Sequence, residues 1–370
     1  MNVPKLRFKE FTDEWNYEIF DNIIDIRSKS YNPNNNINYK CIELENINQG
    51  AGTINGYFNS CEQKSTKNIF YKNEVLFGKL RPYLKKYWYA TFDGVCSSEI
   101  WVAKSKSSEK ITNKFILYIF QTNYFLQLCN LSTGSKMPRA DWDFIKEHFF
   151  AIPTLQEQDK IARFLSLLDK KIELQAKKIE VLKYFKKGLI NYLFSQNTSM
   201  QITVKDLGTI ITGTTPSKEN KLFWDNGNIP WITPSDITYE RDISNSMVKL
   251  TEDGLLNGRY LPKDSILVTC IASIGKNAVL KEDGSCNQQI NAIIPNKKFN
   301  HNYIYYLMEY MSNYMKSIAG TSATSIINKN DFENLNVNVH SITDQIKIDK
   351  ILSSIEIKEK LEDEYLHNIT

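Results

Sequence analysis

The sequence lacks the cysteine and histidine patterns that hold metal ions. Among its 370 residues are six cysteines and four histidines. The cysteines lie far apart with no C-x-x-C pair, and the histidines are isolated, with no H-E-x-x-H motif. These absences argue against a zinc site, a catalytic metal and a dense disulfide framework, and we expect the thiols to be reduced.

Long apolar runs are also missing. No stretch approaches the roughly 18 apolar residues of a membrane-spanning helix, and the N-terminus, MNVPKLRFKEFTDEW, carries scattered charges where a signal peptide has an apolar core. We therefore expect a cytoplasmic protein without a membrane partner. With 42% hydrophobic and 12% aromatic residues the chain can form packed cores, and its length predicts two or three domains.

Complete catalytic motifs are not found. There is no G-x-S-x-G sequence, and the phosphate-loop-like IASIGKN (271–277) lacks the upstream glycine and has Asn277 where Ser or Thr would bind magnesium. The tetrapeptide with which amino-methyltransferases hold a flipped adenine, Asn or Asp before two prolines and an aromatic residue, is missing too. The acid-x-lysine sequence EIK (356–358) occurs on a helix, where we expect a solvated face. The sequence therefore predicts a chain that is not an enzyme.

An internal repeat is the strongest feature that the sequence does have. TLQEQDKIARFLSLL (154–168) aligns without a gap with SITDQIKIDKILSSI (341–355), an offset of 187 residues. Three shorter matches keep the same order: FDNII with LGTII, CSSEI with CNQQI, and FILYIF with YIYYLM. Chance similarity between amphipathic helices would explain only the first match. The repeat therefore predicts two duplicated domains, each followed by its own helix.

The domains are expected at 1–153 and 200–340, with helices at 154–199 and 341–370. Each helix starts with a capping box, Thr154 with Glu157 and Ser341 with Asp344. Short β-branched or aromatic runs predict strands in both domains, and a helical stretch follows them, at 113–128 and 302–317. The fold class is thus mixed α/β (α+β), with two pseudo-repeated domains separated by a long helical element.

Both long helices carry an apolar seam at heptad spacing. Its positions are Ile161, Leu165, Leu168, Ile172, Ile179 and Leu182, and in the second copy Ile348, Leu352 and Ile355, while Gln175 and Lys186 interrupt it. Residues 157–190 carry a net charge of +4 and residues 344–370 a net charge of −3, which favours pairing between the two helices. We expect an antiparallel two-helix coiled coil within the chain. The alternative is that each helix packs only on its own domain.

Local charge, rather than the overall +4, indicates nucleic-acid binding. Between Lys64 and Lys86, seven Lys or Arg and several aromatic residues accompany one acid. Such cations neutralise phosphates, and Arg can also bind guanine edges; a strand pair with a solvated polar face is the alternative. Small and basic residues at 132–142, and in their counterpart at 319–332, suit loops near a DNA backbone. The candidate DNA-binding residues are Lys64, Lys67, Lys72, Lys79, Arg81, Lys85, Lys86, Ser135, Lys136, Arg139, Arg241, Arg259, Lys276, Asn277, Thr321, Ser322 and Thr324.

The chain resembles the specificity subunit of a Type I restriction-modification system. The resemblance lies in IPTLQEQDKIARFLSLLDKKIE (152–173), the weaker VHSITDQIKIDKILSSIE (339–356) and the opening PKLRFKEFTDEW (4–15). The second copy departs from the first, because Val339 and His340 stand where Ile152 and Pro153 do.

The resemblance implies two target recognition domains, each of which reads one part of a split site in double-stranded DNA. The paired helices would set the spacing and dock two modification subunits, which carry S-adenosylmethionine and methylate adenine, and motor-nuclease restriction subunits would complete the complex. No cofactor is then expected in this chain. Two alternatives remain open: a self-contained methyltransferase or nuclease with an unrecognised site, and an adaptor or anti-restriction scaffold that does not read DNA.

Overall fold

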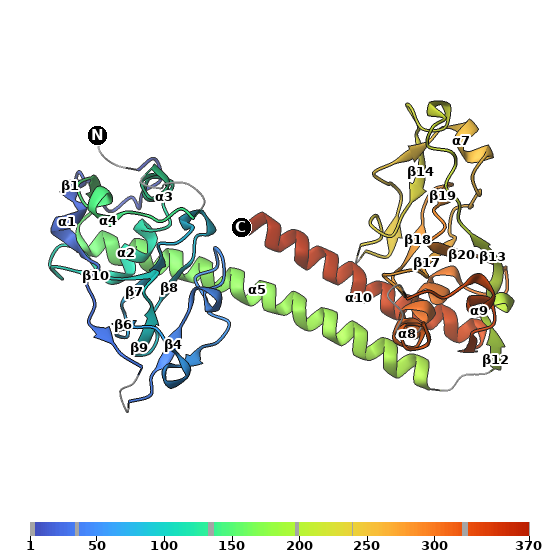
Figure 1. Ribbon diagram of the computed structural model, residues 1–370, viewed down its shortest axis with the longest axis horizontal. Coiled ribbons are helices and arrows are strands. Elements are labelled where there is room, and N and C mark those ends of the chain that lie inside the picture. The colour runs from blue at the N-terminus through green and yellow to red at the C-terminus, as the bar shows by residue number, and fades with distance from the viewer. Residues whose placement is uncertain are drawn as a thin grey trace. The chain divides into compact units, whose positions relative to one another are not determined.

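The computed structural model describes residues 4–33, 37–131, 137–196, 200–238, 240–319 and 325–369. Two compact units make up the chain, Met1–Glu173 and Leu174–Thr370, and their boundary falls inside the long helix α5 (Leu155–Ser195). Figure 1 labels the elements of each unit. Each unit therefore contains part of α5, and each is described by itself.

The first unit consists of two small sheets, a two-stranded pair at its base and short helices. One sheet has the order β2-β10-β7-β8 and the other β3-β6-β9-β4-β5, while β1 pairs with β11. Their bounds are β1 (Asn16–Ile19), β2 (Ile24–Asp25), β3 (Ser30–Tyr31), β4 (Lys40–Ile42), β5 (Phe58–Asn59), β6 (Lys67–Phe70), β7 (Val75–Gly78), β8 (Tyr87–Tyr89), β9 (Gly94–Ser97), β10 (Ile100–Ser105) and β11 (Phe149–Ile152). The helices are α1 (Phe20–Ile23), η1 (Leu44–Asn46), η2 (Ser60–Glu62), η3 (Pro82–Leu84), α2 (Asn113–Ile119), α3 (Asn123–Leu131) and α4 (Trp142–Ile145).

Aromatic side chains fill the core between the first sheet and the helices α2 and α3. The ring of Phe77 on β7 lies 5.3 Å from that of Phe120 and 5.4 Å from that of Phe125. The expected helix at 113–128 is interrupted here, because the side chain of Thr122 accepts a hydrogen bond from the N–H of Phe125 and caps a second helix. The sequence prediction of one helix was wrong at this point.

The second unit repeats this plan. Its sheets have the orders β13-β20-β17-β18-β15 and β16-β14-β19, and β12 pairs with β21. The strands are β12 (Met200–Thr203), β13 (Gly208–Thr212), β14 (Ile229–Ile232), β15 (Asp242–Ile243), β16 (Lys249–Leu250), β17 (Ile266–Thr269), β18 (Asn277–Leu280), β19 (Ser285–Cys286), β20 (Ile290–Pro295) and β21 (Asn336–Val339). The helices are α6 (Val204–Leu207), η4 (Lys221–Phe223), α7 (Glu252–Leu256), α8 (His301–Ile318), α9 (Lys329–Glu333) and α10 (Ile342–Ile369).

The two units share the order of four strands in one sheet, β2-β10-β7-β8 and β13-β20-β17-β18. In each, one sheet contains a parallel pair, β4 with β9 and β14 with β19, and the base is an antiparallel pair, β1 with β11 and β12 with β21. The units differ in that the single helix α8 takes the place of α2 and α3, that β15 adds a strand parallel to β18, and that the other sheet has three strands instead of five. The predicted mixed α/β fold with two pseudo-repeated domains is confirmed.

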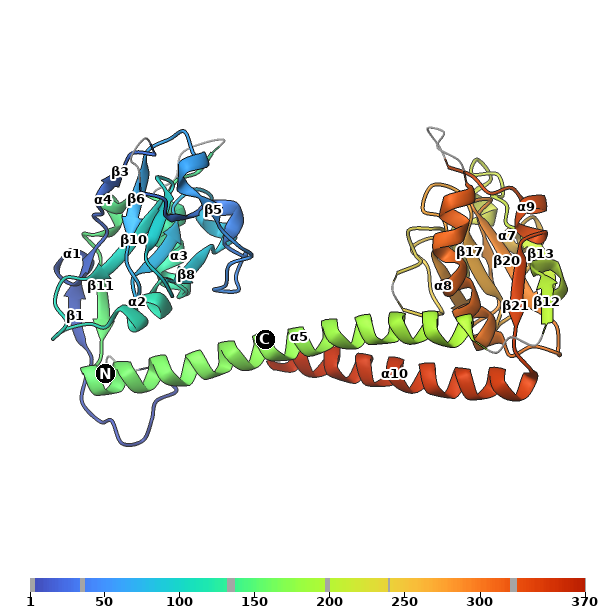
Figure 2. The same cartoon turned by 90° about the horizontal axis from the view of Figure 1, so that it is seen from below.

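The C-terminal part of α5 runs antiparallel to α10 inside the second unit, as Figure 2 shows. Lys178 near one end lies 2.6 Å from Glu362, and Lys186 further along lies 3.5 Å from Glu356, so residue numbers rise on one helix as they fall on the other. Close to the domain, Ile190 and Phe194 of α5 join the same buried core as Ile348 of α10. The expected antiparallel helix pair is therefore present.

Candidate nucleic-acid interface

A buried glutamine joins the first domain to the helix that follows it. Gln158 on the first turns of α5 is fully buried. Its Nε2 donates to the carbonyl oxygens of Lys110 at 2.7 Å and of Pro153 at 3.0 Å, and its Oε1 accepts from the N–H of Thr112 at 3.0 Å. Because Thr112 is the N-cap of α2, the glutamine fixes the start of α2 against α5.

The second unit repeats this joint with Gln345, the counterpart of Gln158. The Nε2 of Gln345 donates to the carbonyl oxygen of His340 at 2.9 Å, and its Oε1 accepts from the N–H of Asn300 at 3.0 Å. Asn300 is the N-cap of α8. The repeated sequence thus encodes two equivalent buried hydrogen bonds in each unit, with a third at Gln158, and losing either glutamine would leave buried backbone groups unsatisfied.

A tyrosine, a serine and an acid form a second repeated contact. In the first unit the Tyr118 hydroxyl donates to Asp169 at 2.8 Å and lies 3.0 Å from Ser166. In the second unit the Tyr306 hydroxyl donates to Glu356 at 2.8 Å and lies 3.3 Å from Ser353. Burial raises the pKa of both carboxyl groups, that of Asp169 and that of Glu356. Glu356 is the acid of the EIK sequence (356–358), and its side chain is only 16% exposed. The expectation that EIK lies on a solvated face was therefore wrong for Glu356.

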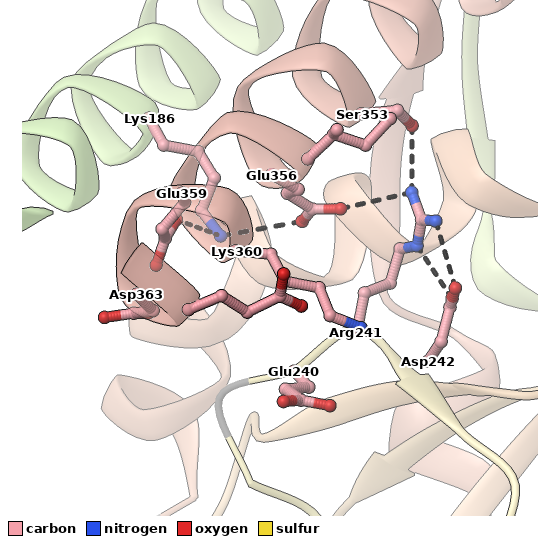
Figure 3. A pocket seen from close by; sticks show the side chains of 11 residues that line it. Lys186, Glu240, Arg241, Asp242, Ser353, Glu356, Glu359, Lys360 and Asp363 are labelled. Carbon is pink, nitrogen blue, oxygen red and sulfur yellow. Dashed lines mark hydrogen bonds and ion pairs between the residues drawn. The ribbon is translucent and has the colours of Figure 1, made fainter. Parts of the chain in front are cut away.

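Arg241 binds to this contact in the second unit, as Figure 3 shows. Its Nη1 lies 3.1 Å from Glu356 and donates to Ser353 at 2.8 Å, while its Nε lies 2.8 Å from Asp242. Burial disfavours the charged guanidinium, but the hydrogen bond to Asp242 and the charge of Glu356 outweigh it and raise the pKa of Arg241. Arg241 thus ties the segment before β15 to α10, and we withdraw it from the candidate DNA contacts.

The helix pair is held by polar side chains that sequence analysis treated as interruptions. Gln175 donates to the carboxylate of Glu362 at 2.7 Å. Lys186 lies 3.5 Å from Glu356 and 3.6 Å from Glu359, and Figure 3 draws it between these two acids. The opposite net charges of residues 157–190 and 344–370 predicted that these two helices pair, and the ion pairs between α5 and α10 agree with this prediction.

The predicted apolar seam has mixed surroundings. Ile161 packs against the core of the first domain, and Ile348 and Leu352 belong to the core of the second. Ile179 is buried, whereas Leu168 is exposed; the remaining seam positions, Leu165, Ile172, Leu182 and Ile355, are partly buried. The first turns of each helix therefore pack on their own domain, as the alternative held, because the apolar residues there complete the domain core.

The hairpin between β7 and β8 brings four of the candidate cations together. Arg81 and Lys85 have left-handed backbones, with φ of 53° and 50°, on either side of the short helix η3. Both side chains are exposed, and Tyr83 between them is 52% exposed. Lys79 is partly exposed, whereas Lys86 donates to the carbonyl oxygen of Leu44. The tip thus presents two cations and an aromatic ring to solvent.

The backbone of this hairpin is tied to the segment that follows residues 132–136. Arg81 donates from its N–H to the carbonyl oxygen of Pro138 at 2.7 Å, and Ala140 donates to that of Lys79 at 2.9 Å. Arg139 itself lies 3.0 Å from Glu99. Two segments that sequence analysis selected separately are thus adjacent.

The second unit places the equivalent segments together in the same way. In the turn between β17 and β18, Ala272 donates from its N–H to the carbonyl oxygen of Ser325 at 3.1 Å, and Ile327 donates to that of Cys270 at 2.9 Å. Lys276 is exposed at this turn. Its neighbour Asn277 is buried and donates to the carbonyl oxygen of Tyr305 at 2.7 Å. Asn277 therefore supports the fold, and we withdraw it as a base-reading residue.

The other candidates are spread over both units. Lys64, Lys72 and Arg259 are exposed, and they lie outside the two hairpin turns. Lys67 is only 3% exposed and forms an ion pair with Glu43, so the expectation that it contacts DNA is corrected: pairing of β6 with β9 places Lys67 opposite Ser97, inside the fold. Five candidates lie outside the described residues: Ser135, Lys136, Thr321, Ser322 and Thr324.

Metal-site and membrane geometry can be assessed for the described residues. No group of three or more His, Cys, Asp or Glu side chains is arranged there to hold a metal ion. Within the same ranges, the helices are too short or too polar to cross a membrane. The candidate nucleic-acid interface consists of the two hairpin tips, one on each repeated unit.

Comparison with known proteins defines the class of this repeated scaffold. A family model described as the Type I restriction modification DNA specificity domain matches the chain twice, over residues 17–184 and 197–370. The two units are thus two copies of a DNA specificity domain.

Similar sequences and structures agree with this match. The MjaIX specificity subunit of Methanocaldococcus jannaschii is 35% identical over 161 residues, which are 40% of this chain and 36% of that protein. The HindI specificity subunit of Haemophilus influenzae is 23% identical over 79% of this chain and 83% of its own length. The crystal structure of the Type I restriction-modification S subunit from M. genitalium shares the fold, with a TM-score of 0.60 at 16% identity over 99% of this chain and 96% of that one.

The chain belongs to the family of Type I restriction-modification specificity subunits, the non-catalytic DNA-recognition components of these systems.

Proposed function

We propose that the chain recognises a bipartite, asymmetric site in double-stranded DNA and directs modification and restriction subunits to it in the cytoplasm. The observation that carries the proposal is the pair of equivalent hairpin tips, which share backbone hydrogen bonding but expose different side chains. Two readers with unlike surfaces recognise two unlike sequences, and one chain that holds both recognises a split site.

The side chains proposed to contact DNA differ between the units. In the first unit they are Arg81 and Lys85, with Lys79, Arg139 and the more distant Lys64 and Lys72 as further cations. Arg can bind a guanine edge with two hydrogen bonds, whereas Lys suits phosphates. In the second unit they are Lys276 and, further away, Arg259. The candidates outside the described residues, Ser135, Lys136, Thr321, Ser322 and Thr324, remain predictions.

The partner subunits are proposed to dock on the solvent face of the helix pair. On α5 this face consists of Leu174, Val181, Tyr184, Phe185 and Tyr192, each at least half exposed. On α10 it includes Ile357 and Leu361, which are 61% and 59% exposed. Contiguous exposed apolar residues of this kind are typical of protein–protein interfaces.

Gly188 supports close approach of a partner at this face. It lies one helical turn from both Tyr184 and Tyr192, and no atom lies within 4 Å of the position where a Cβ would stand. Glycine inside a helix costs roughly 1 kcal/mol relative to alanine, and the described residues offer no packing reason for it. Two modification subunits, which carry S-adenosylmethionine and methylate adenine, are the proposed occupants, and motor-nuclease subunits join them.

Methylome sequencing of cells with and without the gene tests the proposed function. We expect loss of one asymmetric, bipartite, adenine-methylated motif when the gene is removed. A continuous motif, or no change in methylation, would contradict the proposal. Methylation or cleavage by the purified chain alone would favour the self-contained enzyme, and assembly without any sequence preference would favour the adaptor.

A further inference from the structure

A cationic cleft lies inside the second unit, next to the β17–β18 turn. Its volume is about 520 Å³, and it is lined by the C-terminal part of α5, the turn itself and α8, with Glu359 of α10 and Thr238 at its edge. Five lysines and two acids are among the lining residues, namely Lys183, Lys186, Lys187, Lys276, Lys316, Glu309 and Glu359. The lining therefore has an excess of positive charge.

Three of the five lysines form no ion pair with an acid within the part of the chain that the structure describes. Lys186 is held by Glu356 and Glu359, and Lys183 lies at 3.9 Å from Glu359. By contrast, no ion pair joins Lys187, Lys276 or Lys316 to a described acid, and all three are exposed. Since Glu359 is already engaged by lysines, these three ammonium groups dominate the free charge of the cleft.

Burial weakens the remaining negative charge. Glu309 faces the cleft from α8, and burial raises its pKa, although the charges of Lys186 and Lys187 act in the opposite direction. A raised pKa favours the neutral carboxyl group. Glu309 therefore offsets the lysines less than its formal charge suggests.

The lining residues follow helix periodicity on both sides of the cleft. On α5, Lys183, Lys187 and Asn191 are four residues apart, so they lie on one face at intervals of about 6 Å. On α8, Ser312 and Lys316 have the same spacing. Cations and small polar groups in rows of this kind suit a run of phosphates and carry no base-reading geometry.

A glycine holds the turn against α8. Gly275 has a left-handed backbone, with φ of 81°, and a Cβ at this residue would lie 2.4 Å from the Oγ of Ser312. Only glycine permits so close an approach. Lys276, the next residue, is thereby fixed at the junction between the turn and the cleft.

We propose that this cleft binds the sugar-phosphate backbone of DNA beside the base pairs that the β17–β18 turn contacts. Lys187 and Lys316 each neutralise a phosphate, and Lys276 links the cleft to the turn. The inference rests on the proposed function and extends it, because it gives α5 a direct role in DNA binding in addition to spacing and docking.

The test compares the wild-type complex with modification subunits and the complex that carries Lys187→Ala and Lys316→Ala. Both residues lie outside the turn, so the variant separates backbone contacts from base reading. Fluorescence anisotropy on target and scrambled duplexes, over a range of salt concentrations, gives the salt dependence of affinity. We expect the slope of log affinity against log salt to decrease by roughly 2, since each phosphate contact contributes about 0.9. The preference for the target duplex should stay unchanged.

A matched control carries Lys297→Ala and Lys298→Ala. These lysines are exposed between β20 and α8 and do not line the cleft, so the salt slope should equal that of the wild type. Lys187→Arg with Lys316→Arg should restore the wild-type slope. Duplexes with single neutral methylphosphonates should weaken wild-type binding beside the half-site of the second unit and have no effect there on the alanine variant.

The outcomes separate this inference from the proposed function. If the wild type prefers its target and the alanine variant keeps the full salt slope, the cleft inference is wrong while the proposed function stands. If calorimetry shows that the variant loses only the binding of a nucleoside triphosphate, the cleft takes a free phosphate ligand and the inference is again wrong. If the wild-type complex has no target preference, the proposed function itself fails.

Discussion

The two hairpin tips differ more than the scaffolds that carry them. The first tip exposes Arg81, Tyr83 and Lys85, whereas the described part of the second exposes Lys276 among small residues such as Ala272. In each unit, the backbone of the turn is hydrogen-bonded to an equivalent downstream segment, 138–140 in the first unit and 325–327 in the second. Buried polar groups must be satisfied in any stable fold, so the scaffold is constrained, while solvent-exposed tips are free to change.

A second difference concerns charge at the base of the domains. The first unit joins Tyr118 to Asp169, whereas the second joins Tyr306 to Glu356 and adds Arg241 and Lys186 around this acid. Gln121 in the first unit and Glu309 in the second occupy equivalent positions, directly after the aligned FILYIF and YIYYLM segments. Here too the second unit has a charged residue where the first has an uncharged one. The second unit therefore surrounds the acid of this contact with two cations, whereas the ion pair at the start of α5 in the first unit joins Arg7 to Glu157 instead.

The largest effect is expected from substitutions on the proposed docking face, because they should abolish methylation at both half-sites equally. Tyr184→Glu with Phe185→Glu places two charges at the proposed docking face, where loss of aromatic anchors costs about 3 kcal/mol or more, roughly 100-fold in affinity. Methylation of both parts of the motif should fall together, because the subunits no longer bind.

Pull-down of the modification subunits and methylome sequencing measure this effect. Tyr17→Glu is the matched control, since Tyr17 is 58% exposed on β1 and lies away from α5's docking residues in sequence and element. Normal subunit binding by the α5 variant would remove this face from the proposal.

The buried glutamines should give the next largest effect. Gln158→Leu removes three hydrogen bonds and Gln345→Leu removes two. Unsatisfied buried groups cost about 1–3 kcal/mol each, so we expect losses of roughly 2–4 kcal/mol in the free energy of unfolding, with the larger loss for Gln158. Denaturant unfolding of the full chain measures both.

Gln201→Leu is the control for this pair, because Gln201 is exposed on β12. Equal stability of all three variants would show that the joint is not maintained by these side chains.

Substitutions at the tips should act on one half of the motif at a time. Arg81→Ala is expected to cost about 1–3 kcal/mol of discrimination if it binds a guanine edge. It should relax one part of the methylated motif and leave the other unchanged. Lys276→Ala should act on the other part, with a smaller loss. Relaxation of both parts by either variant would contradict the assignment of one tip to one half-site.

The smallest expected effect concerns pH. Burial raises the pKa of Glu309 above its ordinary value of 4.5, so the folded state binds a proton more readily than the unfolded state. Stability contributed by this group is therefore present at low pH and decreases as pH rises through the raised pKa. Glu309→Gln, which introduces the residue found in the first unit, should make unfolding less pH-dependent in this range.

Denaturant midpoints measured between about pH 4 and pH 8 test this prediction, with the exposed Glu147→Gln as the control. An identical pH profile for wild type and Glu309→Gln would show that the glutamate is not protonated preferentially in the folded chain.

The repeat and the fold class were predictable because their signals are local or periodic. The capping boxes, the buried Gln158 and Gln345 and the strand runs recur at a nearly constant offset, so an alignment of the chain with itself reveals them. The pairing of the two long helices was predictable as well, because their opposite net charges can be counted directly in the sequence.

The surroundings of individual polar residues could not be predicted in this way. Arg241 contacts Ser353, 112 residues away, and Gln175 contacts Glu362, 187 residues away. Lys67 carries the same charge as the exposed Lys64, and only the strand pairing buries it against Glu43. A basic cluster in sequence therefore includes both surface cations and structural ion pairs, which the three-dimensional neighbours alone distinguish.

The glutamine joints have a consequence for how such proteins acquire new specificities. Among the described residues, the side chains of Gln158 and Gln345 hydrogen-bond only to main-chain atoms: the carbonyl oxygens of Lys110, Pro153 and His340 and the N–H groups of Thr112 and Asn300. A joint that contacts backbone alone is indifferent to the side chains of the domain it holds. These hydrogen bonds therefore tolerate changes of side chain in the recognition domains, whereas the tyrosine–acid contacts and the apolar residues of each helix match the helix to its own domain.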